Sequence, residues 1–356
     1  MKTVVTITGI RPDFVRMSNI FKKLDNEFNH ILIHSGQHFD FNLSDVFFNE
    51  LNIRKPNYNL NIGSKCNNHY EFVGRLSQSI IELFKKEKIS PDIVLFLGDS
   101  NSVLCSVTLK KEGYKIGHIE SGMRSYDIRM QEEINRKVCD TVSDYCFVYH
   151  ENYKQILLSE GKKNDQVFNV GNTITEIVTD FYHEMIRKDK KKNCIIVDIH
   201  RPENFLDRKR LQNIISLSQI ASDTLKIPAY LLEFKRTLAK IEEFELSTVG
   251  IDIIPLMGFK KYMQMSYDAT LIISDSGTAQ EEPGILKTPT IVPRDYTERP
   301  ESVVNGCSIM INVNEYNKKL FSETVKQSQS SMAFNTEWLG DGKTSGNIID
   351  ILKEIL

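Results

Sequence analysis

The stretch that decides the fold is Ile93–Asn101, which reads IVLFLGDSN, five apolar residues followed at once by a small polar turn. A short apolar run that ends in glycine is typical of a strand buried on both faces of a parallel sheet. Similar runs occur on either side of it, at residues 4–7, 31–33, 116–119, 146–148 and 167–170. Because amphipathic stretches separate these runs, they predict repeated strand–helix–strand units and a parallel sheet.

The same rhythm starts again after a lysine-rich stretch, Arg187–Asn193, which we interpret as a solvated loop or helix end. Further apolar runs follow it at residues 194–199, 229–232, 251–256, 271–273 and 290–292. A chain of 356 residues is also longer than a single core usually supports. We therefore expect an α/β protein with two Rossmann-like, doubly wound domains, at residues 1–168 and 169–342. A C-terminal helix, 343–356, is expected to pack back on the first domain.

Composition excludes several classes of function. The chain carries 45 Lys and Arg against 47 Asp and Glu, a formal net charge of -2, so no basic surplus is available for nucleic acid or an anionic membrane. The six cysteines form no CxxC pair, which argues against a disulfide framework or a zinc site. The apolar run at the start of the chain is short and soon followed by Arg11 and Asp13, so we expect a cytoplasmic protein without a signal peptide.

Polar residues gather directly after the predicted strands. In doubly wound sheets ligands bind beyond the carboxyl ends of the strands, so these positions are the candidates for a site. They are residues 9–12, 35–38, 98–101 and 120–124 in the first half, and 200–204, 275–278 and 294–301 in the second. Any one of them is more often a turn or a surface charge, but their repetition at strand ends favours a binding site.

The segment Asp275–Thr278 is the sharpest of these signals. It is small and flexible and precedes an apolar-periodic segment, 279–286, that we expect to be a helix with Glu281 and Glu282 in its first turn. Free N–H groups at such a helix start are suited to an anion. Neither the GxxxxGK[ST] nor the GxGxxG motif occurs in the chain, so phosphate binding without ATP hydrolysis or hydride transfer is favoured.

Taken in order, these segments resemble the non-hydrolysing UDP-N-acetylglucosamine 2-epimerases over nearly the whole chain. The motifs are GIRPDFVRM, SGQHFD, GDSNS, HIESGMR, QEEINR, GNT, HRPENF, SDSGTAQEE, RDYTERPE and GDGKTS. The resemblance implies two domains facing across a cleft in the GT-B arrangement and an isomerase that inverts C2 of a UDP-2-acetamido sugar. It also implies a homodimer that needs neither a cofactor nor a metal.

The resemblance also assigns roles to residues. It implies four catalytic residues, Asp99, Glu120, Glu132 and His200. It implies a larger set that binds UDP or the sugar, namely Arg11, Arg16, Gln37, His38, Arg124, Arg136, Asn172, Arg201, Glu203, Asn204, Phe259, Ser276, Gly277, Thr278, Glu282 and Arg299. From the residues alone, Glu120 could instead pair with Arg124 or Arg136, and His200 could be a core or capping histidine.

Several positions depart from the usual family pattern. Ile10, Asp13, Arg16 and Gln131 stand where Thr, Glu, Lys and Pro are usual, and residues 232–236 lack the histidine of that segment. Residues 124–133 form a shorter segment than in the UDP-N-acetylglucosamine enzymes. It is similar to the branch that acts on UDP-2-acetamido-2,6-dideoxy-L-hexoses, the UDP-N-acetyl-L-fucosamine and UDP-N-acetyl-L-quinovosamine synthases of polysaccharide pathways. A hydrolysing epimerase, a GT-B glycosyltransferase and a non-catalytic UDP-sugar sensor remain alternatives.

Overall fold

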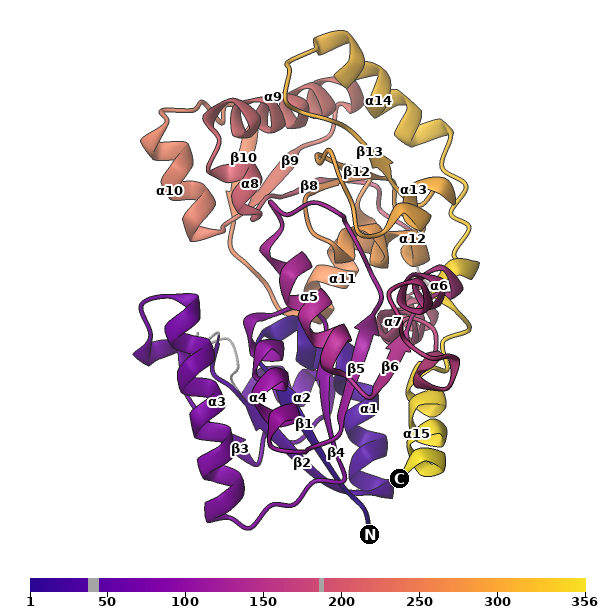
Figure 1. The fold of residues 1–356 in the computed structure, drawn as a ribbon. Helices are drawn as coiled ribbons and strands as arrows, with labels where there is room; N and C mark the ends of the chain where they lie inside the picture. Colours follow the sequence, from indigo (N-terminus) through magenta and orange to yellow (C-terminus); the bar gives the residue numbers. More distant parts are fainter. Residues whose placement is uncertain (38–44, 186–188) are drawn as a thin grey trace. The chain divides into compact units, whose positions relative to one another are not determined.

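The computed structural model describes residues 1–37, 45–185 and 189–356 (Figure 1). Contacts divide the chain into two compact units, which we treat separately. Unit 1 consists of Met1–Ile177 and Leu339–Leu356, and unit 2 of Val178–Trp338. The division expected after residue 168 falls inside the last strand of unit 1, β7 (Val167–Asn169).

Unit 1 is built on a parallel sheet whose described strands have the order β3-β2-β1-β4-β5-β6-β7. Their bounds are β1 (Thr3–Thr8), β2 (Asn29–His34), β3 (Tyr58–Asn59), β4 (Ile93–Leu97), β5 (Ile116–Ser121), β6 (Tyr145–Val148) and β7. Each of the six apolar runs predicted in this half forms a strand. Strand order reverses between β1 and β4, which is the switch point where doubly wound sheets bind ligands.

Helices cover both faces of this sheet. They are α1 (Arg11–Glu27), α2 (Asp45–Leu51), α3 (His69–Lys86), α4 (Ser106–Lys111), α5 (Gln131–Val142), α6 (Glu151–Ser159), the start of α7 (Thr173–Met185) and α15 (Thr344–Ile355). From Val178 onward, α7 belongs to unit 2. The buried face of α3 packs on Val5, Val94 and Phe96. The C-terminal helix α15 lies alongside α1 (Figure 1). Both termini of unit 1 therefore contribute to one core.

Unit 2 repeats the design, with the parallel strand order β10-β9-β8-β11-β12-β13. Its strands are β8 (Ile195–Asp198), β9 (Ala229–Leu232), β10 (Ile251–Ile254), β11 (Leu271–Ser274), β12 (Thr290–Val292) and β13 (Ile309–Met310). Its helices are α8 (Pro202–Phe205), α9 (Arg208–Leu225), α10 (Lys235–Glu243), α11 (Phe259–Asp268), α12 (Glu282–Leu286), α13 (Pro300–Val304) and α14 (Lys318–Ser330). The five apolar runs predicted here are all strands, and the switch point lies between β8 and β11. The predicted fold class, two Rossmann-like doubly wound units, is confirmed.

One predicted element is wrong. The single helix expected over residues 279–286 is a 3-10 turn, Thr278–Gln280, followed by the five-residue helix α12. The two pieces meet at Glu281, the N-cap residue of α12, whose φ is -118° and ψ is -64°. Pro283 explains the break, because proline has no N–H to donate back into a preceding turn and is tolerated only at a helix start.

Within the three described ranges, no helix combines the length and the apolar character that crossing a membrane requires.

Candidate active site

Glu120 lies at a distortion in β5, next to the switch point of unit 1. The register of β5 against β6 shifts between Ile119 and Ser121, and Glu120 has a positive φ of 71°. Its carboxylate is 3% exposed and forms an ion pair with Arg16 of α1. The Tyr149 hydroxyl also donates to it at 3.4 Å. A bulge of this kind turns a side chain out of the normal alternation of a strand. Here the side chain that it turns is the buried carboxylate of Glu120, which meets Arg16.

Asp99 follows the neighbouring strand, β4, and α5 holds it there. Its carboxylate is 23% exposed and accepts a hydrogen bond from Arg136, which is fully buried. The Asn135 amide donates to the Asp99 carbonyl at 2.9 Å and to the Asn101 side chain at 3.1 Å. A Cβ added at Gly98 would lie 4.0 Å from the carboxyl carbon of Glu120. The two carboxylates therefore occupy adjacent strand ends.

Arg124 lies in a buried ion-pair cluster. Its guanidinium lies 2.7 Å from Asp140 and donates to Glu160 at 2.6 and 3.0 Å. Of the two arginines considered as partners of Glu120, Arg136 binds Asp99, and Arg124 binds Asp140 and Glu160. Glu120 forms its ion pair with Arg16, which lies on α1 and far away in sequence.

The remaining predicted residues of unit 1 have varied surroundings. Gln37 accepts hydrogen bonds from the Ser102 N–H and hydroxyl, each at 3.1 Å. Asn172 is buried and caps α7 by accepting from the Ile174 N–H at 2.9 Å. Arg11 and Glu132 are half-buried in the first turns of α1 and α5. His38 lies outside the described residues.

Asp13 fixes the turn between β1 and α1. One of its oxygens accepts from the N–H groups of Gly9, at 2.9 Å, and Ile10, at 3.2 Å. Burial raises the pKa of this carboxyl to about 7; the two N–H groups oppose the rise and nearby Asp99 adds to it. Asp13 is thus an acid that titrates near neutral pH at the candidate site.

We expect Asp13→Asn to change how stability depends on pH. The folded pKa of about 7 lies above the unfolded value of 3.8, so the proton favours folding. That contribution is complete below pH 4 and is lost as the pH rises through 7, with an upper limit of about 4 kcal/mol. The difference in unfolding free energy between wild type and variant, from urea titrations between pH 4.5 and 8, should shrink with rising pH. A difference that stays constant over this range would contradict the assignment.

In unit 2, Asp275 connects the ends of β8 and β11. One carboxylate oxygen accepts from the His200 N–H at 3.0 Å, and the other accepts from the Arg201 N–H at 3.1 Å and the Asn204 amide at 3.0 Å. The residue is fully buried, and burial raises the pKa of its carboxyl. Asp275 therefore sets the path of the chain on which His200 and Arg201 lie.

His200 is held between two acids. Its Nδ1 lies 2.9 Å from Asp198, whose other oxygen accepts from the Ser274 hydroxyl at 3.1 Å. Burial lowers the pKa of His200, but Asp198 and Asp275 outweigh that effect and raise it. The potential ligand atoms of Asp198, His200 and Asp275 lie within 4.8 Å of one another, as in a metal site. Because N–H groups already occupy both oxygens of Asp275, we assign the cluster to the orientation of His200.

The turn after β11 packs directly on Arg299. The hydroxyls of Ser276 and Thr278 are 3.2 Å apart, and a Cβ at Gly277 would lie 2.7 Å from Arg299 Nη1. Arg299 Nε donates to Glu281 at 2.7 Å, and Nη1 donates to Glu298 at 2.5 Å. The guanidinium therefore lies directly against the turn, and a side chain at position 277 would have to displace it.

Gly277→Ala should weaken UDP binding by about 10-fold, because the methyl group must displace the Arg299 guanidinium from the turn. Calorimetric titration with UDP measures the effect. Gly74→Ala in α3 is the matched control, since nothing lies within 4 Å of the added Cβ and UDP affinity should not change. Equal affinity of the Gly277→Ala protein and wild type would separate this turn from UDP binding.

The other predicted residues of unit 2 surround the same strand ends. Arg201 lies 3.8 Å from Glu298, and Glu203 accepts from the Tyr296 hydroxyl at 2.7 Å. Asn204 is buried between Asp275 and the Pro293 carbonyl. Glu282 is the first residue of α12, and Phe259 begins α11, where its ring packs edge-on against Phe181.

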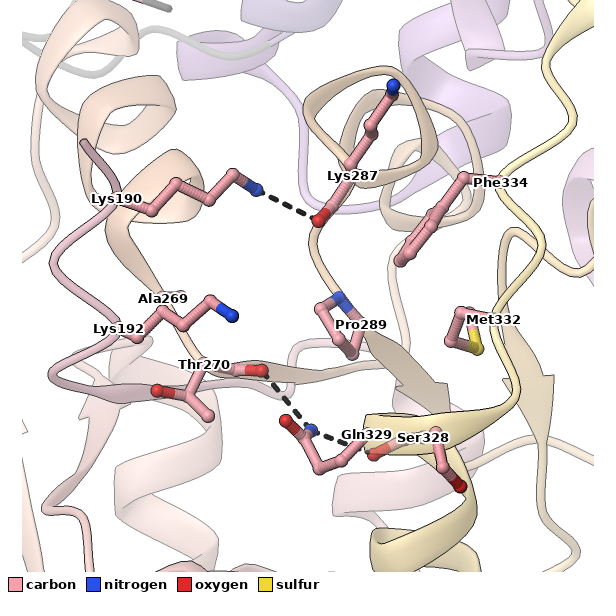
Figure 2. A pocket seen from close by; sticks show the side chains of 11 residues that line it. Lys190, Lys192, Ala269, Thr270, Lys287, Pro289, Ser328, Gln329, Met332 and Phe334 are labelled. Carbon is pink, nitrogen blue, oxygen red and sulfur yellow. Dashed lines mark hydrogen bonds between the residues drawn. The ribbon is translucent and has the colours of Figure 1, made fainter. Parts of the chain in front are cut away.

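A pocket of about 200 Å³ lies at the opposite edge of unit 2, where β11 and β12 begin (Figure 2). Lys190 of the lysine-rich stretch donates to the carbonyls of Leu286, at 2.5 Å, and Lys287, at 2.8 Å, and to the Thr288 hydroxyl at 3.3 Å. These acceptors use all three N–H groups of the ammonium. Burial, together with nearby Lys192, lowers the pKa of Lys190 to about 8. Lys190 therefore caps the C-terminal end of α12 by binding its last carbonyl groups. None of the predicted site residues lines this pocket.

The fold and these strand ends define a class of protein, an α/β protein of two Rossmann-like units. One unit carries two acids at adjacent strand ends, and the other carries a histidine after β8 and a hydroxyl-bearing turn after β11. Comparison with known proteins identifies the family. The family model described as UDP-N-acetylglucosamine 2-epimerase matches residues 22–353, and the chain belongs to this family.

Relatives and solved structures agree with this assignment. The chain is 34% identical to the UDP-N-acetylglucosamine 2-epimerase of Methanocaldococcus jannaschii over 97% of each chain. It is 31% identical to the UDP-2,3-diacetamido-2,3-dideoxy-D-glucuronate 2-epimerase of Pseudomonas aeruginosa over 99% of each. The crystal structure of the M. jannaschii enzyme in complex with UDP-GlcNAc and UDP matches with a TM-score of 0.89 and 32% identity, covering 99% of this chain and 100% of that one. The protein is thus an epimerase, and the prediction of an isomerase is confirmed.

Proposed function

We propose that the protein inverts C2 of a UDP-2-acetamido sugar by eliminating UDP and adding it back. The observation that carries the proposal is the pair of carboxylates, Asp99 and Glu120, on adjacent strand ends, each bound to a buried arginine. Two proton-handling groups are needed because one face of C2 loses a proton and the other face gains one. Glu132, in the first turn of α5, is the third candidate.

The proposed chemistry has two balanced steps. A carboxylate takes the C2 proton, the C–H electron pair forms the C1=C2 bond, and the C1–O bond breaks with its pair leaving on UDP. The resulting 2-acetamidoglycal is then protonated at C2 on the opposite face while UDP returns to C1. Because C2–H is not adjacent to a carbonyl, stabilisation of the departing diphosphate must supply much of the rate.

We assign binding of the UDP group chiefly to unit 2. The Ser276–Thr278 turn provides hydroxyls and N–H groups, and Arg299, His200 and Arg201 provide positive charge near the same strand ends. Charge-assisted hydrogen bonds from such groups strengthen as negative charge develops on the leaving oxygen. Phe259 and Glu282 are the proposed contacts of the uracil and of the ribose hydroxyls.

For the sugar, we propose a UDP-2-acetamido-2,6-dideoxy-L-hexose. Support comes from the short segment 124–133, which resembles that branch. The P. aeruginosa relative, named for a diacetamido-glucuronate sugar, indicates that the family scaffold accepts hexoses other than N-acetylglucosamine. In this chain the segment is held by Glu133, which accepts from the Ser125 N–H at 2.8 Å and hydroxyl at 3.0 Å. A cytoplasmic homodimer that needs no cofactor is part of the same proposal.

Deuterium exchange tests the function. The protein is incubated in heavy water with UDP-N-acetylglucosamine or with a UDP-6-deoxy-L-hexosamine derivative, without any acceptor, and C2 is monitored by NMR. We expect deuterium at C2 and the C2 epimer with UDP attached, faster for the 6-deoxy-L substrate. Free sugar that accumulates in step with UDP from the start would indicate a hydrolysing epimerase. Turnover that requires an acceptor would indicate a glycosyltransferase.

A further inference from the structure

His118 is a buried histidine in the middle of β5 that the sequence analysis did not single out. Its Nδ1 lies 2.7 Å from Asp140 of α5, and its Nε2 lies 2.7 Å from the carbonyl oxygen of Gly98. The side chain is fully buried. His118 therefore links α5 to the residue that directly precedes Asp99.

The hydrogen bonds require this imidazole to be charged. A carboxylate and a carbonyl are both acceptors, so each ring nitrogen must carry a proton to satisfy them. Burial opposes the charge, but neighbouring Cys139 and Asp140 outweigh it and raise the pKa of His118 to about 10. Both bonds are thus present throughout the neutral range.

Asp140 extends the connection to the second carboxylate. Its other oxygen accepts from the Gly122 N–H at 3.1 Å and lies 2.7 Å from Arg124. One buried acid therefore holds the turn after β4, through His118, and the turn after β5, through Gly122. Asp99 lies on the first of these turns, and Glu120 lies near the end of β5, two residues before Gly122.

Both turns have backbone conformations that need support. Gly98, Glu120 and Gly122 have φ values of 71°, 71° and 80°. A side chain at a positive φ has a steric cost, and Glu120 is the one of the three that is not glycine. Such a conformation persists only where the surrounding structure holds it. At Gly122 a Cβ would lie 2.5 Å from the Tyr153 carbonyl oxygen, so the turn cannot relax outward.

We propose that His118 and Asp140 are positioning residues that hold Asp99 and Glu120 in register for proton transfer. The proposal rests on the function proposed above. It assigns no contact with substrate to either residue. Small shifts of a catalytic group reduce turnover strongly even when binding is unchanged. The expected signature is therefore a loss in kcat with little change in KM.

Two substitutions of His118 separate its bonds. In His118→Gln the amide nitrogen occupies the place of Nε2 and can still donate to the Gly98 carbonyl, whereas in His118→Asn it occupies the place of Nδ1 and can donate only to Asp140. We expect kcat for C2 exchange to fall about 10- to 100-fold in His118→Asn, with KM within about 3-fold of wild type. His118→Gln should recover at least part of that loss.

His30→Gln is the matched control. His30 is also a buried histidine of this sheet, with Nδ1 2.5 Å from Asp25 and Nε2 2.8 Å from the Thr6 hydroxyl, but it lies at the opposite end of the strands. The His30→Gln variant should be less stable than wild type but should have the same kcat, when kcat is measured well below the melting temperature. Asp140→Asn provides a second test of the connection and should lower kcat in the same way if His118 variants fold poorly.

Wild-type kcat in both His118→Asn and Asp140→Asn would overturn the proposal, as would an equal loss of kcat in His30→Gln. Asp99→Asn and Glu120→Gln are assayed alongside these variants. If those two exchange C2 normally, the proposed function fails; if they are inactive while His118→Asn is fully active, only the positioning role fails.

Discussion

Replacing Glu120 with glutamine should reduce the rate of C2–deuterium exchange by about 10²- to 10⁴-fold, the range associated with loss of a general acid or base. Glutamine keeps the shape of the side chain but cannot take a proton. UDP lacks the hexose whose C2 proton is transferred, so its affinity for the variant, measured by calorimetry, should stay within a few fold of wild type. Exchange is followed by NMR at substrate concentrations well above KM.

The ion pair with Arg16 adds a second expectation for the same variant. Both partners are more than nine-tenths buried, so the neutral amide leaves the Arg16 charge without its carboxylate. Breaking a buried pair in this way costs about 3–5 kcal/mol of unfolding free energy. Exchange must therefore be measured well below the variant's melting temperature, where the folded fraction is equal to that of wild type.

Asp25→Asn is a control that loses ion pairs without reaching the site. Asp25 binds His30 and Arg54 at the other end of the sheet. This variant should be destabilised yet exchange C2 normally. Wild-type exchange in Glu120→Gln would remove Glu120 from the reaction, whereas a matching loss of UDP affinity would indicate that it shapes the binding site.

Strands could be predicted from the sequence because a buried parallel strand is a continuous apolar run. All eleven runs identified in this way form strands. The two strands that were missed, β3 and β13, are two residues long and lie at sheet edges. Residues such as Tyr58 and Asn59 are held there by pairing with β2, a contact that composition does not encode.

Candidate positions in the site could also be predicted, but their partners could not. Strand ends are visible in the sequence, whereas Glu120 pairs with Arg16 from an element more than 100 residues earlier. His118 gave no signal because a single histidine inside an apolar strand is usually a core residue. Its importance depends on where Asp140 and Gly98 lie in space. The three positive φ values around Glu120 likewise depend on tertiary contacts.

Asp275→Asn should weaken UDP binding about 10- to 100-fold and lower the unfolding free energy by about 1–3 kcal/mol. Asp275 accepts three N–H donors with two oxygens, and asparagine offers one oxygen and an NH₂ group. At least one backbone N–H, of His200 or Arg201, must then face another donor in a buried position. The turn that carries both residues should therefore shift.

Asp268→Asn distinguishes this effect from a general loss of stability in unit 2. Asp268 is also buried and accepts from the Lys191 N–H at 3.2 Å and the Gln264 amide at 3.0 Å, but it precedes β11 instead of following it. Its substitution should cost stability without changing UDP affinity. If both variants lose UDP affinity equally, unit 2 responds as a whole. In the described part of the chain, Asp275 is the carboxylate that joins His200, Arg201 and Asn204. If neither variant loses UDP affinity, UDP therefore does not bind at the ends of β8 and β11.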